Sequence, residues 1–233
     1  MSLPRGCGGG GKDRQANVGG YHSGVVTIFL SGGSSGRGPE TFRRAAFEFG
    51  RGVARRGWIL RTGAGGGRSI MGAAADGALS EGGRVEGVIL EKFWRVRHRR
   101  LHALRVCRTF AGRKAGLLRG AEAAVFFPGG CGTLDELGDA IALRQNGFTE
   151  IPILLVNLGG FFDPLLEWFR RAGRDGFLYG DPAFETVRDA AGALRRLDRL
   201  GLQKRKERER KRERRRRWTT SSSGSSARSS RWR

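Results

Sequence analysis

Hydrophobic and polar positions follow two alternating periods along most of the chain. Short apolar runs rich in β-branched residues, each bounded by Gly or polar clusters, predict buried strands. These runs are 24–30, 58–60, 85–90, 122–127 and 153–156. Stretches with apolar residues at helical spacing predict helices at 40–56, 70–79, 133–145, 164–171 and 190–200. The apolar side of the first helix is expected to consist of Phe42, Ala45, Phe49 and Val53.

This alternation of strands and helices predicts an α/β fold. Parallel neighbouring strands need crossover connections, so we expect a Rossmann-like, three-layer fold whose mostly parallel sheet is covered on both faces. In such sheets, ligands bind beyond the carboxyl ends of the strands. Three Gly-rich loops stand at that position in the chain, at 31–36, 62–67 and 128–132.

Both ends of the chain differ in composition from its centre. We divide the sequence into a Gly-rich leader (1–23), a Rossmann-like domain (24–202) and a basic Ser/Arg-rich tail (203–233). We expect the leader and the tail to be disordered. The run 204–217 alternates Lys and Arg with a few Glu, which suits non-specific nucleic-acid contact, nuclear targeting or a solvated helical extension.

Positive charge is the strongest feature of the composition. The 233 residues contain 44 Lys and Arg against 22 Asp and Glu, a formal net charge of +22. Such an excess indicates an anionic partner. The tail carries half of it, with 14 basic and 3 acidic residues. The segment from Lys92 to Arg119 is also rich in arginine, and we interpret most of it as a solvated cationic surface.

Cysteine and histidine give no sign of a metal site. Cys7, Cys107 and Cys131 are too widely spaced for a disulfide framework or a zinc-binding pair. We interpret them as reduced thiols, and His22, His98 and His102 as surface residues. No apolar run approaches the ~20 residues that cross a bilayer. We therefore expect a soluble, cytoplasmic protein without membrane contact, with the basic run as a potential nuclear signal.

The third Gly-rich loop is the best candidate for a ligand site. A helix start offers unpaired N–H groups and a partial positive charge, which suit a phosphate. Gly129, Gly130 and Gly132 would expose backbone amides there, and Thr133 would add a hydroxyl. A tight strand-to-helix turn without any ligand is the alternative. Since neither a dinucleotide fingerprint nor a P-loop is present, a mononucleotide is the better candidate.

Glu136 lies one helical turn after Thr133 and has two interpretations. Its carboxylate can stabilise an oxocarbenium-like sugar, or activate water, on a nucleotide whose phosphate rests on the loop. It can equally be the Glu of a capping box that Thr133 begins. Arg113 and Lys114, ahead of the strand that leads to the loop, can clamp the phosphate. Asp135 is expected to complement the helix dipole.

Several motifs together resemble the Lonely Guy family, whose members are often labelled lysine decarboxylases. The stretch 128–136 fits the family pattern PGGxGTxxE, and Arg113-Lys114 resembles its second motif. The loops 31–36 and 62–66 and the stretch 70–76 resemble its Gly-rich loops and central helix. Further matches are Gln145, Ile151-Pro152 and 161–166, so the resemblance covers about 24–200.

The resemblance implies a Rossmann-like homodimer that hydrolyses the N-glycosidic bond of (N6-modified) adenosine 5′-monophosphate. The products would be a free base and ribose 5-phosphate, in cytokinin activation or nucleotide salvage. Arg113 and Glu136 would be catalytic, without a metal or redox cofactor. The substrate would be bound by Ser34, Gly65, Gly66, Met71, Lys114, Gly129, Gly130, Gly132 and Thr133. A non-hydrolytic nucleotide or molybdenum-cofactor carrier is the alternative.

Overall fold

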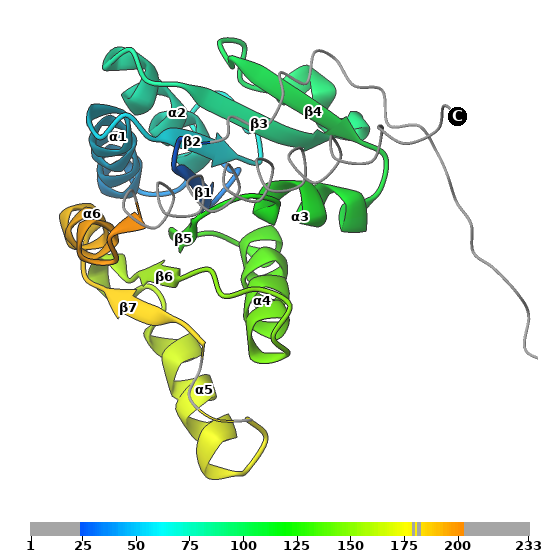
Figure 1. Ribbon diagram of the computed structural model, residues 1–233, viewed down its shortest axis with the longest axis vertical. Coiled ribbons are helices and arrows are strands. Elements are labelled where there is room, and N and C mark those ends of the chain that lie inside the picture. The colour runs from blue at the N-terminus through cyan, green and yellow to red at the C-terminus, as the bar shows by residue number, and fades with distance from the viewer. Residues whose placement is uncertain (1–23, 179, 181–182, 203–233) are drawn as a thin grey trace, which may run out of the picture.

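The computed structural model describes residues 24–178, 180 and 183–202, and Figure 1 shows their arrangement. The expected leader (1–23) and tail (203–233) lie outside the described residues. The strands are β1 (Thr27–Ser31), β2 (Ile59–Thr62), β3 (Val85–Leu90), β4 (Ala103–Cys107), β5 (Ala123–Phe126), β6 (Ile153–Val156) and β7 (Glu185–Val187). The helices are α1 (Glu40–Arg55), α2 (Ile70–Ser80), α3 (Phe110–Leu118), α4 (Cys131–Gln145), α5 (Asp163–Arg174) and α6 (Ala190–Arg199). Short 3-10 helices η1 (Glu91–Val96) and η2 (Leu158–Gly160) complete the set.

The seven strands form one parallel sheet in the order β4-β3-β2-β1-β5-β6-β7. The chain moves outward from β1 in one direction through β4, then returns and moves outward in the other direction from β5. Leu30 at the centre of the sheet lies opposite Thr62 of β2 and Val125 of β5. The predicted three-layer α/β fold is confirmed.

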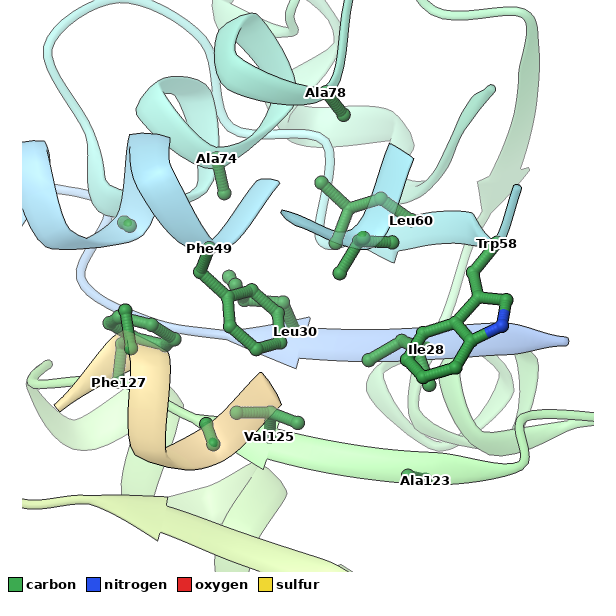
Figure 2. Close-up of a cluster of buried hydrophobic side chains, with 14 of the residues drawn as sticks. Ile28, Leu30, Phe49, Trp58, Leu60, Ala74, Ala78, Ala123, Val125 and Phe127 are labelled. Carbon is green, nitrogen blue, oxygen red and sulfur yellow. The ribbon is translucent and has the colours of Figure 1, made fainter. Parts of the chain in front are cut away.

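Helices cover both faces of this sheet, so that its central strands are apolar on both sides. One face packs against α1, α2 and α6, and the other against α3, α4 and the start of α5. Figure 2 shows the first of these cores, where Ile28 and Leu30 of β1 meet Phe49 of α1 and Ala74 of α2. No helix among the described residues is long and apolar enough to cross a membrane.

Besides the two 3-10 helices, one α-helix and two strands between residues 91 and 187 were not predicted. These are α3 and the two edge strands β4 and β7. Strand β4 is only partly buried and carries Arg105 at its centre, while β7 has three residues that remain largely exposed. Edge strands need not be continuously apolar, because one side meets solvent. Their sequences therefore lack the pattern that identifies the central strands.

The buried side of α1 also differs from the expected one. Phe49 and Val53 are fully buried, as predicted, but Ala46 is buried where Ala45 was expected, and Phe42 is only partly buried. The cause is the very close approach of α2. A Cβ added to Gly50 would overlap the carbonyl oxygen of Ala74, and one added to Gly77 would overlap that of Phe47. The two helices thus touch backbone to backbone through glycines.

This contact predicts a large cost for a single added methyl group. Gly50→Ala should lower the free energy of unfolding by about 2–3 kcal/mol, because the obstructing atom is backbone and cannot rotate away. Gly138→Ala is the matched control, since Gly138 is exposed within α4 and has open space around it. It should be neutral or stabilising by up to about 1 kcal/mol. Urea unfolding would measure both; equal stability of the two variants would contradict the packing argument.

A surface ion pair fastens α6 to the end of α1. The guanidinium of Arg56 donates two hydrogen bonds of 2.7 Å to the carboxylate of Asp198. These hydrogen bonds hold the pKa of Asp198 below its usual value of 3.8. A lowered carboxyl pKa adds stability above the unfolded value, and this stability is lost as the pH falls through the folded pKa.

Asp198→Asn should therefore cost less than about 1 kcal/mol at neutral pH, as is usual for an exposed pair. The difference from the wild type should vanish once the pH is well below 3.8. Thermal melts from pH 7 down to about 2 would test this, because the difference should shrink as the pH falls below 3.8. A constant difference across that range would show that the carboxylate charge is not responsible.

Candidate active site

The order of the strands reverses between β1 and β5, and the loops that follow these strands meet at that point. In open α/β sheets such a reversal marks the place where ligands bind. The backbone of Gly33 ties three loops together here. Its N–H donates to the carbonyl oxygen of Pro128 at 3.0 Å, and its carbonyl oxygen accepts from the N–H of Ile70 at 2.9 Å. The three predicted Gly-rich loops therefore form one unit.

Helix α4 begins in this unit, with exposed residues at its start. Gly130 is its N-cap residue and supplies no side-chain cap. Nothing lies within 4 Å of a Cβ added to Gly130 or Gly132, whereas one added to Gly129 would overlap the hydroxyl of Thr133. Thr133 therefore fills the space beside Gly129, while the space around Gly130 and Gly132 is free. This geometry suits an anion such as a phosphate.

Arg113 and Glu136 meet directly beside this helix start. The Arg113 Nη1 donates to the Glu136 Oε1 at 2.5 Å, joining α3 to α4. Their side chains are only 14% and 6% exposed. A Cβ added to Gly63, in the loop after β2, would overlap the Arg113 guanidinium, so that loop leaves just enough room for it. The Sδ of Met71 lies against the same position, 3.0 Å from that added Cβ.

Ser31 is a site residue that the sequence analysis missed. Its Oγ donates to the Glu136 Oε2 at 2.5 Å, and its side chain is almost fully buried. Glu136 accordingly accepts on both oxygens, one from a guanidinium and one from a hydroxyl, as an ionised carboxylate does. A polar residue that ends a buried strand at the site edge was the available signal.

The capping-box interpretation of Glu136 is wrong. Helix α4 starts at Cys131, so Thr133 lies inside the first turn and does not cap it. The carboxylate of Glu136 contacts Arg113 and Ser31 instead of its own helix start. The catalytic interpretation of Glu136 stays a prediction.

Lys114 and Asp135 pair with each other on the outer side of the same helices. The Lys114 amino group lies 2.9 Å from Asp135 and 3.4 Å from Asp139. The hydrogen bond to Asp135 raises the pKa of Lys114. A contact between Lys114 and the substrate stays a prediction, and the structure gives this side chain a clear role in linking α3 to α4.

The remaining predicted site residues lie in the loops after β1 and β2. Ser34 is exposed in the first of them, beyond Gly33. Gly65 and Gly66 belong to the second, where a Cβ on Gly65 would lie 2.9 Å from the Met71 Cε. The N–H of Gly66 donates to the carbonyl oxygen of Val96 at 3.1 Å. This loop therefore connects the site to η1.

His98 is not the surface residue that the sequence suggested. It is 8% exposed, and its Nε2 lies 3.2 Å from a carboxylate oxygen of Asp76. Its backbone N–H donates to the carbonyl oxygen of Ala64 at 2.9 Å. Ala64 has a φ of 60°, the left-handed conformation that costs a non-glycine residue roughly 1 kcal/mol. His98 thus helps to hold a strained turn beside the site.

The two described cysteines have different environments. Cys131 is exposed at the start of α4, and Cys107 is buried at the end of β4. Within the described ranges, no three His, Cys, Asp or Glu side chains gather in a way that could hold a metal ion.

Fold and site together define a Rossmann-like protein with an open, uncapped helix start and a buried Arg–Glu pair beside it. Residues 71–193 match the family model described as "Possible lysine decarboxylase". A rice protein named as a probable cytokinin riboside 5′-monophosphate phosphoribohydrolase is 36% identical over 155 residues, covering 66% of this chain and 67% of its own. A phosphoribohydrolase of the same name from Rhodococcoides fascians is 34% identical, covering 66% and 77%. The chain belongs to this family, the Lonely Guy family.

Solved structures share the fold. The molybdenum cofactor binding protein of Rippkaea orientalis has a TM-score of 0.59 at 20% identity, covering 76% of this chain and 97% of its own. The molybdenum cofactor carrier protein of Chlamydomonas reinhardtii has a TM-score of 0.58 at 25% identity, covering 76% and 98%. The same α/β architecture therefore occurs in proteins named for different functions, so function must be argued from the site.

Proposed function

We propose that the protein hydrolyses the N-glycosidic bond of a nucleoside 5′-monophosphate, with N6-modified adenosine monophosphate as the first candidate substrate. The observation that carries this proposal is the buried Arg113–Glu136 pair, which lies beside an open helix start. Curated relatives at 31–36% identity are named for this reaction on cytokinin nucleotides. No metal or redox cofactor is needed.

In this mechanism the phosphate rests on the first amides of α4, between Gly130 and Thr133. The sugar then lies toward Glu136, which is one helical turn away. As the bond from C1′ to the base nitrogen breaks, the base leaves with the electron pair and gains a proton. The carboxylate of Glu136 stabilises the positive charge that develops on the ribose, and water adds its oxygen to C1′ and gives up a proton that balances the one the base gains.

Arg113 has two roles in this proposal. It holds the buried carboxylate of Glu136 in place through a direct ion pair, because a buried charge needs a partner. Its other guanidinium nitrogens remain available to orient the nucleotide. Met71 and the loop 63–66 would border the sugar and base, while Ser34 would approach from the loop after β1.

We also propose that the protein acts as a cytoplasmic homodimer. Large hydrophobic side chains on α4, α5 and their flanking loops support an association surface, since Phe148, Trp168 and Phe177 are 79%, 57% and 78% exposed. Non-specific contact of the tail with nucleic acid, and a nuclear signal at 204–217, remain proposals from sequence.

Variants of the Arg113–Glu136 pair test the proposed chemistry. Glu136→Gln and Arg113→Ala should each lower turnover of N6-isopentenyl-AMP by at least about a hundredfold, as expected when a charged catalytic group is lost. Chromatography of free base and ribose 5-phosphate would measure this. Glu150→Gln, an exposed position with the same chemical change, should retain full activity.

The same assay with AMP separates the alternatives. Release of isopentenyladenine well above adenine supports a role in cytokinin activation, and adenine from AMP alone points to salvage. Full activity of either site variant would contradict the mechanism. Tight nucleotide binding with no released base would favour the carrier alternative.

Ser31→Ala should lower kcat by about tenfold to a hundredfold with little change in KM, because Ser31 contacts the catalytic carboxylate rather than the expected substrate. In the Glu136→Gln background, the second change should add nothing, since Ser31 acts through Glu136. Ser80→Ala, which removes only a hydrogen bond to the Gly77 carbonyl oxygen, is the control. A rise in KM without a fall in kcat would instead indicate that Ser31 binds substrate.

A further inference from the structure

The excess positive charge of the folded domain comes from one segment. Between residues 91 and 119 there are ten Lys and Arg and a single acid, Glu91. The rest of 24–202 contains 17 residues of each sign and is neutral. A solvated surface alone does not require basic residues to gather in one segment, so the position of this segment in the fold bears on its function.

The segment occupies the sheet edge formed by β3 and β4. Leu90, the last residue of β3, lies opposite Cys107, the last residue of β4. The η1 helix and the residues that lead to α3 therefore begin next to each other, at the carboxyl ends of β3 and β4, and β4 is an edge strand of the sheet (Figure 1). Arg108 lies 3.9 Å from Glu91 across this gap.

Aromatic side chains are exposed among these charges. Phe93 and Trp94 are 43% and 40% exposed, although both are large apolar residues. The guanidinium of Arg97 lies 3.6 Å from the centre of the Trp94 ring, and the amino group of Lys92 lies 5.9 Å from that of Phe93. We call this group the η1 platform: Lys92, Phe93, Trp94, Arg95, Arg97 and Arg108.

Few acids neutralise the η1 platform. Lys92 and Arg95 form no ion pair within the part of the chain that the structure describes, and Arg108 has only its long contact with Glu91. Two copies of this chain would bring like charges together there, which disfavours self-association. An acidic peptide would use the charges but has no need of exposed aromatic rings.

We propose that the η1 platform binds single-stranded nucleic acid. Phosphates would contact the lysine and arginine side chains, and bases would stack on the exposed rings of Phe93 and Trp94. Surfaces that bind single strands without sequence preference combine these two elements. The η1 platform adjoins the loop after β2, where Gly65 pairs with Arg97, but binding to it does not depend on hydrolysis. It is also distinct from the basic tail, which contributes its own charge.

The test is fluorescence anisotropy of the full chain with a labelled oligouridylate of about 20 nucleotides. The triple variant Lys92→Gln, Arg95→Gln, Arg108→Gln should bind about tenfold more weakly or worse, with a salt dependence shallower by about 2 in the log–log slope. The triple variant Arg44→Gln, Arg188→Gln, Arg195→Gln is the control, because it removes the same charge from other exposed positions. The tail is present in both variants.

Replacement of the Trp94 ring distinguishes base stacking from charge attraction. Trp94→Leu should weaken binding of the single strand by about tenfold, while Trp94→Phe should retain most of it, because only the latter keeps an aromatic face. Thermal melts would confirm that both variants stay folded. Hydrolysis of nucleotide should be unchanged in all of these variants.

Several results would overturn the proposal. Equal weakening by the platform and control variants would attribute binding to overall charge or to the tail. Equal affinity for duplex and single strand, or equal binding by the Leu and Phe variants, would exclude base stacking. Binding to anionic phosphatidylglycerol vesicles but not to the oligonucleotide would identify a lipid surface instead.

Discussion

The buried carboxylate of Glu136 is the group around which the site is organised. A carboxylate removed from water is stable only if donors replace the lost hydration. Arg113 and Ser31 supply those donors, one to each oxygen. Because they come from α3 and β1 while Glu136 comes from α4, one ionised group fixes the relative positions of three elements. The open start of α4 lies beside the same arrangement.

The backbone contacts around this centre explain where glycine occurs. Gly33 joins the loops after β1 and β5 to the start of α2, and Gly63 leaves room for the Arg113 guanidinium. Further away, Gly50 and Gly77 let α1 and α2 touch, which sets the position of the α2 start that carries Met71. Glycines near the proposed ligand site and glycines in the core thus both allow close contacts that place the loops and helices around Glu136.

Much of the fold and part of the site could be predicted from the sequence. The central strands are evident because parallel strands buried on both faces are continuously apolar. Helix α2 is evident from its apolar residues at helical spacing. The edge strand β4 could not be recognised, since Arg105 interrupts it and one side meets solvent. Glu136 could be identified as a candidate, but rejecting the capping role required the start of α4 at Cys131, and its partner Arg113 lies on another helix. Ser31 and His98 were missed because their partners, Glu136 and Asp76, lie far away in sequence.

The proposed active site and the positive charge lie at different positions along the sheet. The proposed active site occupies the reversal between β1 and β5, where the local charges of Arg113 and Glu136 cancel each other. The net positive charge lies further out, beyond β3 and β4, on the η1 platform. The loop after β2 contacts both regions, because Gly66 donates to Val96 at the end of η1 while Gly63 borders Arg113. A neutral ion pair beside a cationic outer surface would let the two proposed sites bind different anions, although the loop after β2 contacts both.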